Sequence, residues 1–261
     1  MRNFFSRFSS SKDFVLVISW WWARWAYALG ILHGMEKLGL DKNIRAIYGV
    51  SAWAIVWSYI AAGYTARETY EKFVDFFSFG IRKFNLLPKK WLLSNKFLRK
   101  NFSQDLPKTF QELDIPLYIG TTDMKKAEFV IFEKDELVEP LLGSMSIPGI
   151  FEPVPFKDML LMDGGLIDNF PADRAKKKFP SSQIVGIALN KFKENQSLKT
   201  IFDALNISFE ILLRAQTLEK FPLVDHLFYK PLPVGVMDIK EKALRKIFQE
   251  GYDDCIEHFR K

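Results

Sequence analysis

The chain has little cysteine and little histidine, and it has no long apolar run. Among its 261 residues there is one cysteine, Cys255, so an internal disulfide is excluded and a reducing compartment is favoured. We predict that Cys255 is a packed thiol on a terminal helix. Residues 1–13 are basic and rich in Phe and Ser, but they contain no apolar run long enough for a signal peptide or a membrane span. We therefore predict a short surface leader and a cytoplasmic protein.

Composition limits the number of domains. Hydrophobic residues make up 48% of the chain and charged residues 26%, which is enough to bury one large core. We predict a single domain over residues 14–261.

The net charge of +6 suits an anionic partner. Acidic residues are interspersed and no motif of a nucleic-acid module is present, so we expect no nucleic acid partner. Residues 82–102 interleave Lys and Arg with Phe, Trp and Leu, which is typical of a segment at a lipid interface. This favours peripheral contact with a membrane surface. The alternative is that the segment forms the basic outer face of a helical cap.

Strand and helix patterns alternate along the chain. Apolar and β-branched runs predict strands at 14–19, 44–48, 117–121, 129–132, 160–162 and 184–188. Helical spacing predicts helices at 26–38, 52–62, 199–221 and 239–259, and a helical insertion over about 65–106 with Thr65 as an N-cap. This order favours an α/β fold: a three-layer domain with a mixed, mostly parallel central sheet.

Two short motifs are candidates for the chemistry. Gly49-Val50-Ser51-Ala52 lies between a predicted strand and a predicted helix, where a sharp turn would expose the Ser51 hydroxyl as a nucleophile. A serine that caps a helix is the alternative interpretation. Met162-Asp163-Gly164-Gly165 ends a predicted strand in a carboxylate, so Asp163 is a candidate base, although such a turn is also an ordinary loop.

A serine nucleophile needs a group that takes its proton, and histidine is the usual one. None of the three histidines lies in a convincing position. His33 falls within a predicted helix, His226 follows Asp225 in a predicted loop, and His258 is near the end of a polar terminal helix. An aspartate that acts directly on Ser51 is the simpler interpretation.

These motifs together resemble the patatin-like phospholipases, lipid acyl hydrolases that use a Ser-Asp dyad in an α/β fold. That family has an S-G-G-G-x-R-G loop after its first strand, then G-x-S-x-G, then D-G-G or D-G-A. This sequence has SWWWARW at 19–25, GVSAW at 49–53 and DGG at 163–165. It also resembles the family at 28–40, 144–154 and 163–173, and the resemblance spans roughly residues 14–190.

The resemblance implies roles for particular residues. Ser51 would be the nucleophile in an elbow with Gly49 and Trp53, and Asp163 would be the base in a motif with Gly164 and Gly165. The oxyanion loop would comprise Trp20, Trp21, Trp22, Ala23, Arg24 and Trp25, with backbone amides around Trp20 to Trp22 as donors and Arg24 shaping the loop. The implied substrate is a phospholipid or another lipid ester, with no metal and no other cofactor.

Tryptophan departs from the family pattern at six places. The family has glycine at the positions of Trp20, Trp21, Trp22, Trp25 and Trp53, and a small residue is expected at Trp57. Glycines outside the motifs are kept, for example Gly30, Gly34 and Gly63. We infer that the chain is an engineered glycine-to-tryptophan variant of a patatin-like hydrolase.

These tryptophans predict severely impaired or absent activity. A positive φ at a non-glycine residue costs about 1 to 3 kcal/mol, and overpacking a tight contact costs about as much per site. One alternative is a non-catalytic lipid-surface binder, in which the tryptophans and residues 82–102 form an interfacial patch. Another is an ordinary aromatic core. Exposed indoles would also lower solubility.

Overall fold

The computed structural model describes residues 13–19, 25–75, 95–189, 198–230 and 241–260. Within them, eight strands form one sheet in the order β5-β6-β3-β2-β1-β7-β8, with β4 paired to β3. The strands are β1 (Phe14–Ser19), β2 (Ile44–Val50), β3 (Leu117–Asp123), β4 (Glu128–Phe132), β5 (Val154–Phe156), β6 (Met159–Asp163), β7 (Gln183–Ala188) and β8 (His226–Tyr229).

The sheet is mixed. β3, β2, β1, β7 and β8 are parallel neighbours. β4 and β6 each run antiparallel to β3, and β5 runs antiparallel to β6. The predicted α/β fold with a mixed, mostly parallel sheet is therefore confirmed.

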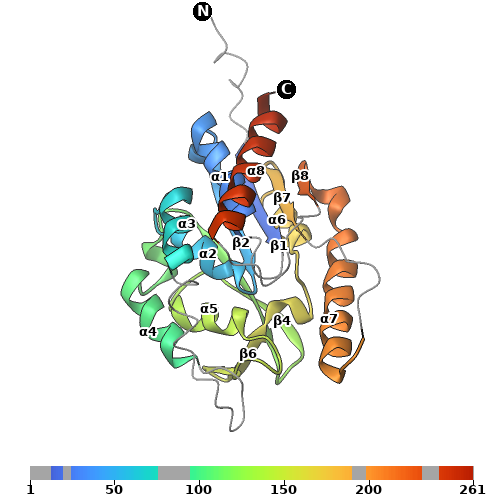
Figure 1. The fold of residues 1–261 in the computed structure, drawn as a ribbon. Helices are drawn as coiled ribbons and strands as arrows, with labels where there is room; N and C mark the ends of the chain where they lie inside the picture. Colours follow the sequence, from blue (N-terminus) through green and yellow to red (C-terminus); the bar gives the residue numbers. More distant parts are fainter. Residues whose placement is uncertain (1–12, 20–24, 76–94, 190–197, 231–240, 261) are drawn as a thin grey trace, which may run out of the picture.

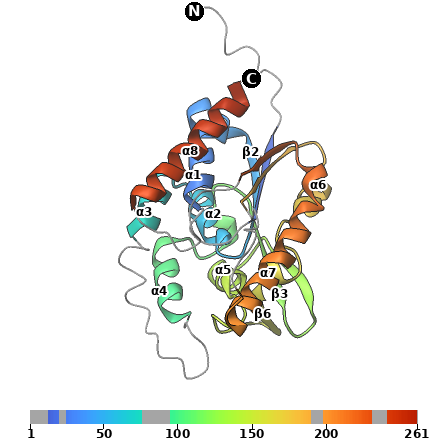
Figure 2. The same ribbon diagram turned by 45° about the vertical axis from the view of Figure 1, so that its right-hand side comes forward.

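Helices cover both faces of the sheet, as Figures 1 and 2 show. They are α1 (Trp25–Leu38), α2 (Trp53–Ala61), α3 (Ala66–Asp75), α4 (Lys96–Asp105), α5 (Val138–Met145), α6 (Ala172–Lys178), α7 (Ile201–Leu218) and α8 (Glu241–Arg260). Within the same described ranges there are also short 3-10 helices, namely η3 (Asp41–Asn43), η6 (Phe110–Glu112), η7 (Gly164–Leu166) and η8 (Phe221–Leu223).

Side chains along β1 point alternately to the two faces of the sheet, and each face has its own hydrophobic core. Leu16 and Ile18 join the larger core with α1, α2, α5 and α8, whereas Val15 and Val17 pack on the other face with α6. Because both faces of β1 are covered, the strand is apolar from Phe14 to Ile18, as is usual in the middle of a parallel sheet.

Several sequence predictions are confirmed locally, and one is wrong. Thr65 caps α3, since the Glu68 amide donates to Thr65 Oγ1 and the Thr65 amide donates to Glu68 Oε2, at 3.2 and 2.8 Å. Cys255 is buried on α8, where burial raises the pKa of its thiol to about 12. His226 was predicted in a loop but begins β8, because its parallel pairing with Val185 extends the sheet by one strand. The predicted leader, apart from Asp13, lies outside the described residues.

The described part of the basic segment 82–102 supports one of its two interpretations. In residues 95–102, Leu98 and Phe102 of α4 are buried in the larger core, whereas Lys96 and Lys100 are exposed. These apolar side chains therefore do not face a lipid surface, and α4 has a basic outer face. Residues 82–94 lie outside the description. Among the described helices, none is long and apolar enough to cross a membrane.

Three of the six tryptophans are core residues. Trp25, Trp53 and Trp57 are all buried, and the rings of Trp53 and Trp57 lie 6.4 Å apart, nearly parallel. Trp25 contacts the rings of Tyr70 and Phe73. For these three tryptophans, the prediction of an interfacial patch is wrong, because their side chains are buried. The prediction of a strained backbone is also wrong, because all three lie in helices. Among the described non-glycine residues, positive φ occurs at Ser51, Ala127, Asp135 and Lys157. Trp20 to Trp22 lie outside the described residues.

The α1 and α8 helices approach closely through glycine, and both figures show them side by side. A Cβ at Gly30 of α1 would lie 2.0 Å from the Phe248 carbonyl oxygen, and one at Gly251 of α8 would lie 2.1 Å from the Tyr27 carbonyl oxygen. Both obstacles are backbone atoms, which cannot rotate away. The crossing therefore requires glycine at these positions.

We predict that Gly251→Ala lowers the free energy of unfolding by about 2 kcal/mol or more, because the helices must separate to make room for the methyl group. Urea unfolding measures this. The matched control is Gln249→Ala on the exposed side of the same helix, which should change stability by less than about 0.5 kcal/mol. Equal effects of the two substitutions would contradict the close crossing.

Candidate active site

The ends of β2 and β6 meet beside β3. On β3, Gly120 pairs with Val50 of β2, and the next residue, Thr121, pairs with Asp163 of β6. Both β3 residues also pair with β4, which takes the opposite edge. Because β4 occupies one edge of β3, β2 and β6 lie along the other edge. β2 runs parallel to β3 and β6 runs antiparallel to it, so the carboxyl ends of β2 and β6 point at each other. Ser51 follows one end, and Asp163 is the other.

Ser51 occupies a strained turn. Its φ of 64° lies in the left-handed region, which non-glycine residues seldom adopt. Helix α2 starts two residues later and returns over β2, so a Cβ at Gly49 would lie 2.9 Å from Ala54 Cα. Gly49 is therefore needed for the close approach, and the turn leaves Ser51 partly exposed and Ala52 exposed.

The Ser51 hydroxyl contacts the Asp163 carboxylate. Ser51 Oγ donates a hydrogen bond to Asp163 Oδ2 at 2.6 Å, and the Gly165 amide donates to Asp163 Oδ1 at 2.8 Å. A Cβ at Gly164 would lie 2.5 Å from the Gly120 carbonyl oxygen, so the chain can turn under the carboxylate only with glycine there. The structure thus brings together the two residues that the sequence singled out.

Burial sets the electrostatics of this pair. Asp163 is 1% exposed, and burial raises the pKa of its carboxyl to about 6 against the opposing effects of the Ser51 hydroxyl and the Gly165 amide. At neutral pH the carboxylate is therefore mostly ionised, yet it is more basic than an exposed aspartate. Such a group can accept a proton from a hydroxyl that it already contacts.

Sequence comparison now bears on this geometry. The family profile described as patatin-like phospholipase matches residues 23–176, which is more than half of the chain. The chain belongs to the patatin-like phospholipase family.

Relatives of this patatin-like chain include much longer proteins. It is 27% identical to the neuropathy target esterase sws of Drosophila melanogaster over 64% of this chain and 12% of that protein. It is 22% identical to human patatin-like phospholipase domain-containing protein 6 over 77% of this chain and 15% of that protein. The chain thus spans about an eighth of the length of such relatives. A relative of similar size is the probable lipid hydrolase 463L of invertebrate iridescent virus 6, 25% identical over 74% of this chain and 76% of that protein.

A solved structure supports the patatin-like fold. VipD from Legionella pneumophila superposes with a TM-score of 0.56 at 12% identity, over 95% of this chain and 66% of that one. At this identity the likeness concerns the fold alone.

One helix end holds both residues of the patatin-like pair. Ser144 of α5 accepts a hydrogen bond from the Ser51 amide at 2.9 Å and donates one to the Gly120 carbonyl at 2.7 Å. Two residues on, the Ser146 carbonyl accepts from the Asp163 amide at 3.0 Å. Sequence reasoning gave Ser144 no role, and its signal was only a small polar residue ending an apolar helical segment.

The other predicted site residues lie elsewhere or outside the description. His33 contacts Glu36, and His226 contacts His258. The described partner of Ser51 Oγ is instead the Asp163 carboxylate. Residues 20–24 of the predicted oxyanion loop are not described, and Trp25 begins α1. Across the described ranges, no cluster of three or more His, Cys, Asp or Glu could hold a metal ion.

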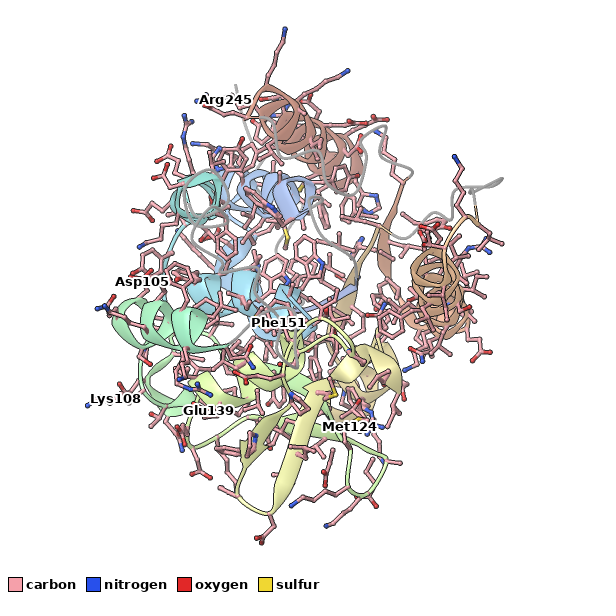
Figure 3. The ribbon with its side chains drawn as sticks, turned by 60° about the horizontal axis from the view of Figure 1, so that its bottom comes forward. Asp105, Lys108, Met124, Glu139, Phe151 and Arg245 are labelled. Atoms are coloured by element: carbon pink, nitrogen blue, oxygen red, sulfur yellow. The ribbon has the colours of Figure 1, made fainter. Side chains whose placement is uncertain are left out.

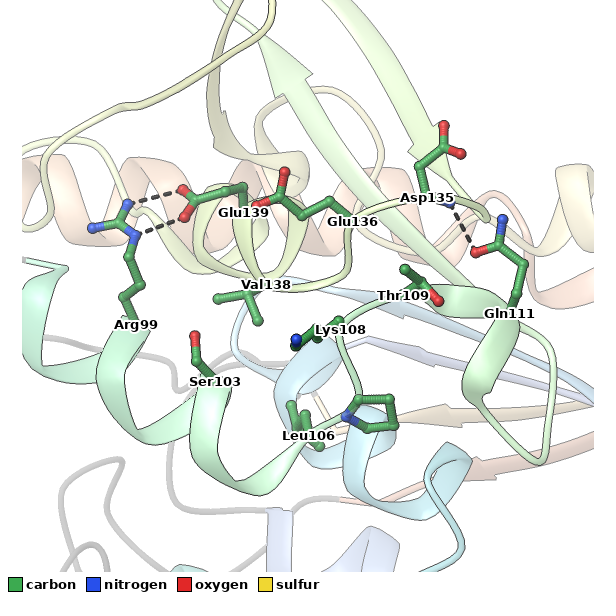
Figure 4. Close-up of a pocket in the computed structure, with 11 residues that line it drawn as sticks. Arg99, Ser103, Leu106, Lys108, Thr109, Gln111, Asp135, Glu136, Val138 and Glu139 are labelled. Atoms are coloured by element: carbon green, nitrogen blue, oxygen red, sulfur yellow. Dashed lines mark hydrogen bonds and ion pairs between the residues drawn. The ribbon is translucent and has the colours of Figure 1, made fainter.

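A groove of about 790 Å³ lies away from this pair, between α4, η6 and the first turn of α5 (Figure 4). Its charged groups include Arg99 and Glu139, which form two hydrogen bonds of 2.6 and 2.8 Å with each other. Neither Ser51 nor Asp163 lines it. The groove therefore adds nothing to the chemistry of the pair.

We predict that Ser144→Ala increases hydrogen exchange at the Ser51 amide by at least about tenfold, because that amide loses its partner and the strained turn opens. Exchange measured residue by residue by NMR tests this. Ser146→Ala is the matched control, since Ser146 holds Asp163 through its backbone and should leave the Ser51 amide protected. Unchanged exchange in Ser144→Ala would show that Ser144 does not hold the turn.

We also predict that Asp163→Asn raises the free energy of unfolding at pH 7 by about 1 to 3 kcal/mol. The folded-state pKa of Asp163 lies above its unfolded value, so the folded protein binds the extra proton and loses stability as pH rises from about 4 through about 6. The asparagine variant lacks this loss, and its advantage should vanish below pH 4. Unfolding curves at several pH values measure it, and a variant less stable at pH 7 would be the contrary result.

Proposed function

We propose that this chain is a serine lipid acyl hydrolase of the patatin-like type, with Ser51 as nucleophile and Asp163 as general base. The observation that carries the proposal is the 2.6 Å hydrogen bond from Ser51 Oγ to Asp163 Oδ2. A strained serine in contact with a buried, basic carboxylate is an arrangement that activates a hydroxyl.

The chemistry follows from that contact. Ser51 Oγ attacks the ester carbonyl carbon while its proton passes to Asp163 Oδ2, which gives a tetrahedral oxyanion. The oxyanion collapses, the alcohol leaves with the proton from Asp163, and the acyl group stays on Ser51 Oγ. Water then attacks the acyl carbon and gives a proton to Asp163, and the second collapse returns that proton to Ser51 as the fatty acid leaves.

The proposed substrate is a phospholipid or another lipid ester. Support comes from the family and from relatives whose names include an esterase, a lysophospholipase of Candida albicans and a probable lipid hydrolase. We further propose that the protein is cytoplasmic and meets this substrate at a membrane surface. The buried thiol of Cys255 is consistent with a reducing compartment.

We propose that Trp20, Trp21 and Trp22 severely reduce turnover. Oxyanion donors must lie about 2.7 to 3.1 Å from the developing charge, and loss of one costs about a hundredfold or more in rate. The family pattern has glycine at these positions, where positive φ is available without strain. Trp25, Trp53 and Trp57 do not contribute to this effect, because all three are buried side chains of helices without positive φ. That the tryptophans replaced glycines remains our inference from the family pattern.

The test is hydrolysis of a short-chain aryl ester. We expect little activity from the chain as written. A version with glycine in place of Trp20, Trp21 and Trp22 should be at least about a hundredfold faster. Ser51→Ala should abolish the activity of either version. Ser51-dependent turnover at equal rates would refute the impairment, and turnover that survives Ser51→Ala would refute the nucleophile.

A further inference from the structure

Exposed apolar side chains gather around one helix. Of eight exposed large hydrophobic residues in the described ranges, six lie on or beside α7: Leu198, Ile201, Leu205, Ile211, Leu212 and Leu223. Ile201 is 80% exposed and Leu205 63%. Isolated exposed leucines need no explanation, but a row of them on a single element marks an interaction surface.

The pattern of α7 is reversed relative to an ordinary surface helix. The exposed side of α7 carries Ile201, Leu205, Ile211 and Leu212, which we call the outer stripe. The other exposed residues on this side are Ala204, Ser208 and Ala215. No charged residue interrupts this side from 201 to 215. The charged residues Asp203, Glu210 and Arg214 are partly buried instead.

The inner side of α7 rests on the turn that follows Asp163. Leu213 is buried, and a Cβ at Gly165 would lie 2.9 Å from Leu213 Cδ2. Gln216 adds polar contacts to the same turn, since its Nε2 donates to the Leu166 carbonyl at 3.4 Å and its Oε1 accepts from the Asn169 amide at 3.1 Å. The outer stripe is therefore one helix thickness away from the loop that carries the proposed base.

α7 stands at the outer edge of the molecule, on the opposite side of the sheet from α1 and α8 (Figures 1 and 2). Ile167, next to η7, is also partly exposed, at 38%.

We propose that the outer stripe docks on the surface of a phospholipid membrane, a proposal that rests on the lipid hydrolase function proposed above. The stripe offers Ile, Leu, Ala and Ser but no aromatic residue and no arginine, the types that dominate protein-protein hot spots. A helix whose apolar side is uncharged along its length suits the hydrocarbon boundary. The exposed Lys199 at its start can contact an anionic head group. The positive and negative residues from 199 to 220 balance, so the apolar stripe supplies most of the expected affinity.

Docking through α7 would hold the turn after Asp163, and Ser51 with it, about one helix thickness from the membrane surface. The ester bond of a phospholipid lies at the boundary between head group and hydrocarbon, so docking would keep the pair close to its proposed substrate. The stripe would thereby select aggregated lipid over a dissolved ester.

The test is binding of the full chain to phosphatidylcholine vesicles with and without phosphatidylglycerol, measured by co-sedimentation. Two double variants, Ile201→Gln with Leu205→Gln and Ile211→Gln with Leu212→Gln, remove the stripe without changing the charge. Each should weaken binding about tenfold or more, because each lost aliphatic side chain contributes that order of affinity. The control is Met124→Gln, another exposed apolar residue, in the turn between β3 and β4 (Figure 3), which should bind as the unchanged chain does.

Thermal melting shows that the variants fold. When the stripe substitutions are placed in the version with glycine at positions 20, 21 and 22, hydrolysis of the dissolved aryl ester should not change, because the Ser51 pair sets it. Vesicle binding needs no turnover, so failure of the docking surface is distinguishable from failure of the proposed function. Absence of vesicle binding by the unchanged chain, or equal binding by the stripe variants, would overturn the proposal. A dimer in solution that the stripe substitutions dissociate would also overturn it, in favour of a second copy as the occupant.

Discussion

The candidate site depends on two strands of opposite direction that end head to head along one edge of β3. Val50 pairs with Gly120, and Asp163 pairs with Thr121, so two neighbouring residues of β3 fix the separation of the strand ends. The hydroxyl and the carboxylate then meet at 2.6 Å without any long loop. Because ladder hydrogen bonds hold both ends, the contact is positioned by the sheet rather than by flexible connections.

This placement costs energy that other parts of the fold offset. Ser51 has a strained backbone. Asp163 is a buried carboxylate, and no cation is among the groups that shift its pKa. The end of α5 stabilises both, through the Ser144 side chain and the Ser146 carbonyl. Backbone strain and a buried carboxylate are common at sites that need a basic, preorganised group, although both lower the stability of the fold.

Much of the framework follows from local patterns in the sequence. The six predicted strands and the cap at Thr65 depend on short-range properties, namely β-branched runs and a side chain that accepts an amide hydrogen bond. Ser51 and Asp163 could be singled out because each stands at a strand end with glycine beside it. Their pairing was predicted from the family resemblance and not from local patterns, because the contact depends on which edge of β3 β6 occupies.

The remaining features depend on tertiary packing. The role of Ser144 needs the position of α5, and the strand at His226 needs β7 as a neighbour. The burial of Trp53 and Trp57 reverses the expectation from the family pattern, since a helix can hold two stacked indoles in a core without positive φ. The exposed side of α7 was also not foreseen, because an apolar periodic helix is normally expected to face inward.

The central claim is that Ser51 is a nucleophile activated by Asp163. The most direct measurement is mass spectrometry of the chain after reaction with a fluorophosphonate, in the version with glycine at positions 20, 21 and 22. The account predicts one adduct, on the peptide that contains Ser51, and much slower formation in Asp163→Asn. An adduct on another residue, or labelling of Ser51 that does not depend on Asp163, would contradict it.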